Sequence, residues 1–200
     1  MLGYATHNGP VYRLGSRVLR LGFSFLSSNS ISALALPFLE EITSTIDESS
    51  WLSTLEGDEI VYLARSATRR VMSVGLSVGS RLPAYCTSMG RVLLAPMSAE
   101  ELTAYLHRVE LKQLTPKTLT DRASLIAELE RARERGHALV DEELEIGLRS
   151  LAMSVRSRSG KVVAAMNTGV HAARVTIPEM IERFLPLLRE GAERLAIAVG

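Results

Sequence analysis

The stretch GHALVDEELEIGLRSLAMSVRSRSGKVVAAMNT, residues 136–168, decides the predicted fold. It contains three runs with the length and apolar content of strands, at residues 137–140, 150–156 and 162–168. The last two runs are joined by Arg158-Ser159-Gly160-Lys161, a short polar turn of the kind that links antiparallel strands. The stretch therefore predicts part of an antiparallel sheet.

The chain upstream predicts further strands. Residues 49–55 and 60–64 lie on either side of the turn Gly57-Asp58 and predict a β-hairpin. A third strand is predicted at Val71 to Leu76. Gly75, Gly79 and Pro83 indicate that the stretch after it is a loop.

Helices are predicted on both sides of these strands. Two capping boxes, Ser98 with Glu101 and Thr176 with Glu179, mark helix starts, and Gly136 marks a helix end. The last helix is expected to bury Ile181, Phe184, Leu188 and Leu195. The predicted helices cover residues 88–95, 98 onward, 121–135 and 176 onward. Together with the strands they predict an α+β fold, in which helices flank a mostly antiparallel sheet.

The amino-terminal part has a different pattern. Residues 3–14 predict a hairpin that turns at Asn8-Gly9, and such a hairpin is barely stable alone, so we expect it to end a larger module. Helical spacing follows at residues 14–25 and 31–46, with Pro37 as a kink or a new start. These helices suit a linker that packs against a partner subunit; the alternative is that they cover the domain's own sheet.

The composition predicts a soluble cytoplasmic chain, with 46% hydrophobic and 22% charged residues and a net charge of +1. The longest apolar run, residues 31–38, is too short to span a bilayer, and we expect no secretion leader and no membrane association. Cys86 is the single cysteine, so no internal disulfide is possible. The charge is uneven, because three arginines and no acidic residue precede Glu40, and such an end could contact a phosphate backbone.

The stretch GSRLPAYCTSMGRVLLA, residues 79–95, is a candidate binding element because a loop runs directly into a helix. Helix amino ends present free N–H groups that hold carboxylates, and a small residue such as Gly90 lets a ligand approach the backbone. Ser88 could donate a hydrogen bond to that ligand, or it could only cap the helix.

The acidic run Asp141 to Glu145 has two interpretations, a metal site or a solvated turn, and the turn is favoured because the run lacks the spacing of a cation-binding loop. Beyond this run, Leu148 and Ser150 share one face of a strand, and Asn167 and Gly169 share a face of the next. A polar group beside a gap in side-chain bulk suits a small polar ligand in an apolar pocket.

The sequence gives little support for catalysis. Cys86 could be a nucleophile at a helix amino end, but a buried, inert thiol is the favoured interpretation. The four histidines, His7, His107, His137 and His171, lack zinc-ligand spacing, and no phosphate loop or dinucleotide fingerprint is present. We therefore expect neither an enzyme nor a metal or other cofactor.

Three stretches, RLPAYCTSMGRVLLA, GHALVDEELEIGLRSLAMSV and SGKVVAAMN, resemble the effector-binding domain of the IclR family of bacterial transcription regulators. The hairpin GYATHNGPVYRLG and the segment RVLRLGFSFLSS resemble the wing and linker helix of that family's winged helix-turn-helix. In detail the chain is most similar to the subgroup that governs protocatechuate and β-ketoadipate breakdown, a form of aromatic catabolism.

The resemblance implies a GAF-like sensor at residues 47–200, linker or dimerisation helices at 15–46 and a wing remnant at 1–14. It also implies homodimers that can pair into tetramers, and DNA binding only through a winged helix-turn-helix missing from this chain. The sensor would bind a small organic acid, an aromatic acid or a β-ketoadipate-pathway metabolite, and so control DNA binding allosterically. The alternatives are a stand-alone GAF-type sensor acting through protein contacts and a thiol enzyme using Cys86.

The family's pocket positions carry over onto nine residues of this chain, to which we add Gly90 as a small residue at the start of the predicted helix. Family members often have cysteine where Ser150 stands and serines where Asn167 and Gly169 stand, although Ser150 and Asn167 keep the site polar. The expected effector-binding residues are Val71, Val74, Leu82, Ser88, Met89, Gly90, Leu148, Ser150, Asn167 and Gly169.

Overall fold

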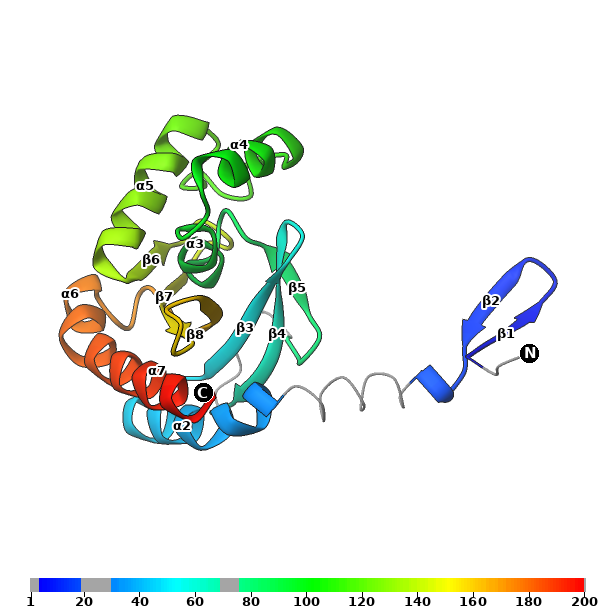
Figure 1. The fold of residues 1–200 in the computed structure, drawn as a ribbon, viewed down its shortest axis with the longest axis horizontal. Helices are drawn as coiled ribbons and strands as arrows, with labels where there is room; N and C mark the ends of the chain where they lie inside the picture. The colour runs from blue at the N-terminus through cyan, green and yellow to red at the C-terminus, as the bar shows by residue number, and fades with distance from the viewer. Residues whose placement is uncertain (1–3, 19–29, 69–75, 200) are drawn as a thin grey trace.

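The computed structural model describes residues 4–18, 30–68 and 76–199, and its centre is a six-stranded sheet in the order β5-β4-β3-β8-β7-β6 (Figure 1). Every neighbouring pair in this sheet is antiparallel, which confirms the predicted α+β class. The strands are β3 (Ser50–Glu56), β4 (Glu59–Ser66), β5 (Arg81–Pro83), β6 (His137–Asp141), β7 (Leu148–Arg156) and β8 (Val162–His171).

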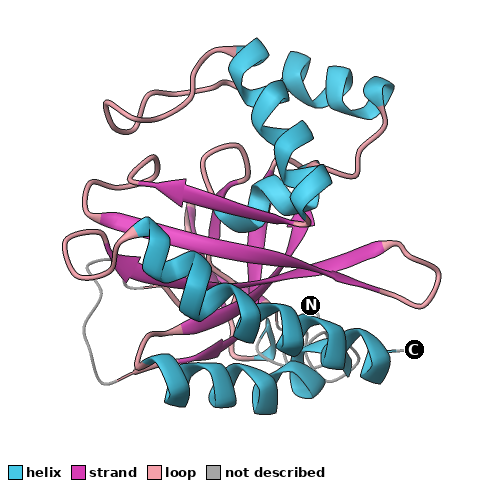
Figure 2. Ribbon diagram, turned by 90° about the vertical axis from the view of Figure 1, so that its left-hand side faces the viewer, coloured by secondary structure: helices cyan, strands magenta, loops and turns pink. Residues whose placement is uncertain are grey.

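Helices cover both faces of the sheet, as Figure 2 shows. One face carries α2 (Ser30–Ile46) and α7 (Leu185–Val199), and the other carries α3 (Ser88–Leu94), with α4 (Ala99–Arg108) and α5 (Arg122–Arg135) outside it. Two apolar cores result, one on each side of the sheet. None of the helices in the described ranges is long and apolar enough to cross a membrane.

The local signals for helix ends are confirmed. Ser98 and Glu101 form a complete capping box at the start of α4, and Gly136 ends α5 in the left-handed conformation with φ of 72°. Thr176 and Glu179 form the second capping box, before the short helix α6 (Ile177–Glu179). The final helical segment is not uniform, because the π-helical turn η1 (Met180–Phe184) separates α6 from α7. Phe184, Leu188 and Leu195 are buried as expected, whereas Ile181 is half-buried.

Helix α2 packs on the domain's own sheet. This is the second of the two roles considered for residues 31–46, the first being contact with a partner subunit. Leu39 and Ile42 are buried in the core that α2 shares with α7, and the helix continues through Pro37 without a break. Contact between this helix and a partner subunit remains a prediction. The first helix, predicted over residues 14–25, lies mostly outside the described residues.

Two turn and loop assignments needed correction. The amino-terminal hairpin, β1 (Ala5–Asn8) with β2 (Val11–Leu14), turns at Gly9-Pro10, one residue later than predicted, and Gly9 has the positive φ of 59°. Residues 81–83 were expected in a loop, but they form β5 because they pair with β4 at the sheet edge. The strand predicted at Val71 to Leu76 lies outside the described residues except for Leu76, which is not in a strand.

Candidate functional site

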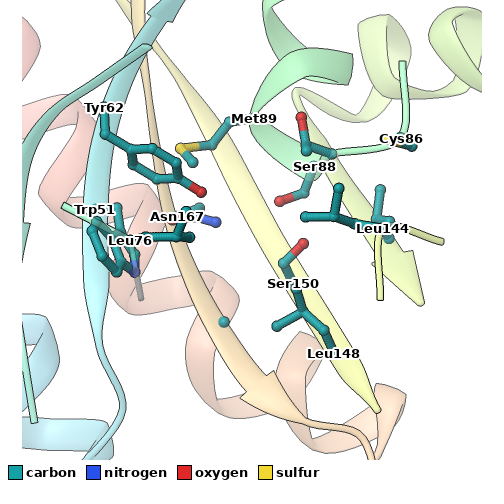
Figure 3. Close-up of a pocket in the computed structure, with 13 residues that line it drawn as sticks. Trp51, Tyr62, Leu76, Cys86, Ser88, Met89, Leu144, Leu148, Ser150 and Asn167 are labelled. Carbon is teal, nitrogen blue, oxygen red and sulfur yellow. The ribbon is translucent and has the colours of Figure 1, made fainter. Parts of the chain in front are cut away.

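A cavity lies between the sheet and the start of α3 (Figure 3). The space open to water-molecule centres is about 40 Å³. A single water needs roughly 10–15 Å³ on this measure, so the cavity has room for several waters or a small ligand. The lining residues are Trp51, Tyr62, Leu76, Cys86, Thr87, Ser88, Met89, Val140, Leu144, Leu148, Ser150, Asn167 and Gly169.

Strand register explains the shape of the sheet wall. Residues directly opposite each other in an antiparallel pair share a face of the sheet. Ser150 lies opposite both Gly169 and Val140, which puts two small residues side by side and leaves a gap in side-chain bulk. Asn167 lies two residues before Gly169 on β8 and therefore on the same face. Trp51 of β3 is opposite Asn167, and the large Trp51 ring lines that end of the gap.

The α3 wall depends on Thr87. Thr87 is the N-cap of this seven-residue helix, and its hydroxyl oxygen accepts a hydrogen bond from the Gly90 N–H at 3.1 Å. The alternative role of Ser88, capping alone, is therefore wrong. The Ser88 hydroxyl is fully buried at the cavity and has no hydrogen-bond partner among the described residues.

Asn167 presents a second unpaired polar atom. Its side-chain oxygen Oδ1 is buried without a partner in the described part of the chain, and its amide group is directed into the space between Ser88 and Ser150 in Figure 3. A buried polar group without a hydrogen bond destabilises a protein by about 1–3 kcal/mol. Two such atoms at one cavity indicate that a polar ligand or water completes their hydrogen bonding.

Burial controls the protonation of two other lining residues. Burial, reinforced by the negative charge of Glu143, raises the pKa of the Cys86 thiol to about 12. Its sulfur donates a weak hydrogen bond to the Pro83 carbonyl at 3.8 Å. Burial also raises the pKa of Tyr62, so its hydroxyl stays neutral. Both groups are therefore uncharged near neutral pH, and Cys86 lacks the thiolate form that nucleophilic attack requires.

A buried ion pair joins the α3 wall to the loop between β6 and β7. Arg91 Nη2 lies 2.6 Å from Glu143 Oε2, and the two side chains are only 2% and 9% exposed. The Arg91 Nε donates to the Tyr85 carbonyl, and Glu143 accepts from the Leu119 N–H. Since Leu144 follows Glu143 and lines the cavity, this pair fixes one side of the pocket.

Other acidic residues of the run 141–145 also form ion pairs. Asp141 pairs with Lys117 and Arg149, and Glu142 also pairs with Lys117. The favoured interpretation, a solvated turn, is therefore wrong at Glu143, which is buried. Within residues 4–18, 30–68 and 76–199, no three histidine, cysteine or acidic side chains gather as metal ligands would.

The structure brings six of the expected effector-binding residues to the cavity: Ser88, Met89, Leu148, Ser150, Asn167 and Gly169. Leu82 and Gly90 do not line it. Leu82 packs against the apolar core of that face, and a Cβ on Gly90 would lie 2.0 Å from the Ala84 carbonyl oxygen. The small size of Gly90 thus admits the protein's own loop rather than a ligand. Val71 and Val74 lie outside the described residues.

Seven lining residues were not predicted. Trp51 and Tyr62 stand on adjacent strands of the predicted hairpin, and their rings are 4.8 Å apart. Trp51 and Ser53 share a face of β3, and the sequence alone did not show that this face holds the site. The others are Leu76, Cys86, Thr87, Val140 and Leu144. Cys86 and Thr87 lie in the stretch 79–95 that was predicted as a binding element, whereas nothing in the local sequence marks Leu76, Val140 and Leu144 as pocket residues.

Comparison with known proteins adds an independent result. Residues 23–197 match the family described as bacterial transcriptional regulator IclR C-terminal. The Pca regulon regulatory protein of Pseudomonas putida is 50% identical over 188 residues, which make up 94% of this chain and 65% of that protein. The chain therefore spans less than two thirds of this relative's length.

Two solved structures are similar in fold and sequence. A transcriptional regulator from Rhodococcus sp. RHA1 is 44% identical with a TM-score of 0.88, over 98% of this chain and 78% of that one. The inducer-binding domain of the PobR transcription factor from Acinetobacter, a double mutant in complex with 3-hydroxybenzoic acid, is 32% identical with a TM-score of 0.79. That alignment covers 82% of this chain and 97% of the PobR domain.

Proposed function

Because this chain belongs to the IclR family of bacterial transcriptional regulators, we propose that its cavity beside α3 binds a small organic acid and that this binding controls DNA binding by the full-length protein. The observation that carries the proposal is the pair of buried polar atoms, Ser88 Oγ and Asn167 Oδ1, which adjoin a largely apolar cavity and have no hydrogen-bond partner among the described residues. A ligand with hydrogen-bonding groups would satisfy both atoms, and an apolar molecule would satisfy neither.

An aromatic acid is the first candidate. The cavity wall contains two aromatic rings, Trp51 and Tyr62, which can contact a planar ligand. The PobR domain with 32% identity was solved with 3-hydroxybenzoic acid. A metabolite of the β-ketoadipate type is the second candidate, and the experiment below distinguishes the two.

The proposed mechanism is allosteric. The acid would bind between the sheet residues Ser150 and Asn167 and the α3 residue Ser88, and would favour one arrangement of a homodimer or tetramer. Linker helices before residue 47 would transmit this preference to a winged helix-turn-helix of the full-length regulator. The acid must bind the two arrangements with unequal affinity, typically by about 1–3 kcal/mol.

We assign no enzymatic activity to this domain and expect it to act in the cytoplasm. The high pKa of Cys86 argues against the thiol-enzyme alternative, because the thiolate is scarce at neutral pH. A stand-alone sensor that acts through protein contacts would use the same cavity, but would not alter DNA binding.

A thermal-shift screen tests the proposal. The probes are 3-hydroxybenzoate, 3,4-dihydroxybenzoate and 3-oxoadipate, and a ligand that binds only the folded state raises Tm. Ser150→Leu should abolish the shift, because the larger side chain fills the gap beside Gly169, and Ser150→Ala should retain a measurable shift. Circular dichroism checks that both variants are folded. An unchanged affinity of Ser150→Leu in calorimetry would reject the cavity as the binding site.

A further inference from the structure

Arg65 stands next to the cavity on the sheet face that carries it. In the strand register Arg65 of β4 lies opposite Trp51 of β3, which in turn lies opposite Asn167 of β8. The three residues therefore form a row on one face. The Arg65 guanidinium carbon lies 4.4 Å from the centre of the Trp51 ring. A positive charge is thus held directly against a residue of the cavity wall.

A second contact fixes the same guanidinium to the wall. The Arg65 Nη1 donates a hydrogen bond of 2.9 Å to the carbonyl of Leu76, which also lines the cavity. Figure 3 places Trp51 and Leu76 on one side of the cavity and Ser88 and Ser150 on the other. Arg65 therefore belongs to the side opposite Ser88.

The charge of Arg65 is not neutralised within the described residues. No carboxylate among them pairs with Arg65, and its Nε is buried without a hydrogen-bond partner. Two other arginines show the contrast, because Arg91 pairs with Glu143 and Arg149 pairs with Asp141. The lining residues in the described part of the chain include no acidic or basic side chain.

Arg65 is half-buried and its Nε is fully buried without a hydrogen-bond partner in the described residues, so the guanidinium bears the cost of losing part of its hydration and gains no counter-charge. An anion in the cavity would relieve this cost, whereas a neutral molecule of the same shape would not. The attraction acts through a partly desolvated wall, where two charges are screened less than in bulk water.

We propose that Arg65 is the charge-selecting residue of this cavity: its guanidinium, held over Trp51, draws the ligand's carboxylate to the side of Trp51 and Leu76. The neutral polar group of the ligand then faces Ser88 and Ser150. This inference rests on the proposed function and adds an orientation to it. It reverses the expectation that the carboxylate lies at the start of α3, where Thr87 already occupies the Gly90 N–H.

Calorimetry with matched acids and amides tests the proposal. The probe pairs are 3-hydroxybenzoate with 3-hydroxybenzamide and adipate with adipamide, each measured against wild type, Arg65→Met, Arg65→Gln and Arg65→Lys. Removal of the charge in Arg65→Met should raise the Kd of the acid about tenfold and leave that of the amide nearly unchanged. Arg65→Gln should behave similarly while retaining a donor for the Leu76 carbonyl, and Arg65→Lys should keep the preference for the acid.

Arg131→Met is the control, because it removes an arginine that pairs with Glu128 on α5, away from the cavity. It should change neither Kd. Ser88→Ala tests the orientation, and it should reduce the preference for 3-hydroxybenzoate over benzoate while leaving the ratio of acid to amide intact.

The outcomes separate the two proposals. Equal loss of acid and amide binding in the uncharged Arg65 variants would mean that Arg65 only supports the wall, and would overturn the inference while the binding site stands. A change of the acid-to-amide ratio in Ser88→Ala would overturn the orientation. Wild-type protein that binds none of the acids would reject the proposed function, and the role of Arg65 with it.

Discussion

The two faces of the sheet are built differently, although the same strands form both. On the face covered by α2 and α7, apolar side chains pack so closely that a Cβ on Gly191 would lie 2.9 Å from Ile42 Cδ1 and 3.2 Å from Met166 Sδ. The face covered by α3 leaves a cavity, and the Ser88 and Asn167 side chains adjoining it each have a polar atom without a partner among the described residues. Unpartnered hydroxyls also occur on the first face, at Ser32 and Ser50 among the described residues, so the two faces differ in the cavity: only on the second do such atoms adjoin space that a ligand can fill.

The second face also depends on charge for its shape. The loop that carries Leu144 is held to α3 by the buried pair Arg91 and Glu143 rather than by apolar packing alone. Removal of one member of a buried pair leaves the other charged and without a partner, which is more damaging than loss of an exposed pair.

The largest expected effect is therefore that of Glu143→Gln, which should lower the free energy of unfolding by about 3–5 kcal/mol. Arg91 would remain buried without its counter-charge, and the Leu144 side of the cavity would lose its anchor. Urea denaturation measures the stability, and the acid-induced rise in Tm measures the pocket. We expect both to fall.

Two controls sharpen this comparison between the faces. Leu188→Ala on α7 should destabilise by about 2–5 kcal/mol but keep the acid-induced rise in Tm, because it creates its cavity on the other face. Glu128→Gln breaks the more exposed pair with Arg131 and should change stability by about 1 kcal/mol or less. If Glu143→Gln were as mild as Glu128→Gln, the ion pair would not support the α3 face.

Cys86 gives a smaller effect that depends on pH. Its pKa is about 12 in the folded chain against a usual value of 9.0, so above pH 9 the unfolded chain loses this proton first. The free energy of unfolding should then fall with rising pH by at most about 1.4 kcal/mol per unit. Below pH 9 both states hold the proton, so this group should make stability no more and no less dependent on pH there. Urea denaturation at pH 8 and pH 10 should show a shallower decline for Cys86→Ala than for the wild type.

Thiol titration provides the independent check. Native protein at pH 8 should react with a disulfide reagent far more slowly than the urea-unfolded chain, because the thiolate is scarce and the side chain is buried. Rapid labelling of native protein would show instead that Cys86 is accessible and ionised.

Local chemistry predicted much of the fold and little of the cavity wall. The capping boxes of α4 and α6 and the glycine at 136 are short-range signals, and each was confirmed. Strand β5 was missed because its pairing with β4 depends on residues some twenty positions away, whereas its own short sequence contains a proline and follows Gly79, which indicated a loop.

Among the site residues, too, those with a local sequence signal were predicted and those placed by long-range contacts were not. Ser150, Asn167 and Gly169 were found because a family resemblance and strand alternation both pointed to them, whereas Leu144 lines the cavity through an ion pair between positions 91 and 143. The role of the Ser88 hydroxyl was open in the sequence, since it could cap the helix or donate to a ligand, and Thr87 was not predicted as the cap. Only the structure distinguishes the cap from the free group.

Removal of these two neighbouring hydroxyls should give the smallest changes in the free energy of unfolding. The two variants should also differ in the sign of that change. Thr87→Ala removes a helix cap and should lower the free energy of unfolding by about 1 kcal/mol. Ser88→Ala removes a buried hydroxyl without a partner and should leave stability unchanged or raise it by about 1 kcal/mol, because no hydrogen bond is lost and a desolvated group is removed. Urea denaturation without ligand measures both, and calorimetry should show weaker binding of 3-hydroxybenzoate to Ser88→Ala. A loss of stability in Ser88→Ala equal to that in Thr87→Ala would mean that this hydroxyl already has a structural partner, and among the described residues the cavity would then offer a ligand only the Asn167 oxygen as an unpartnered atom.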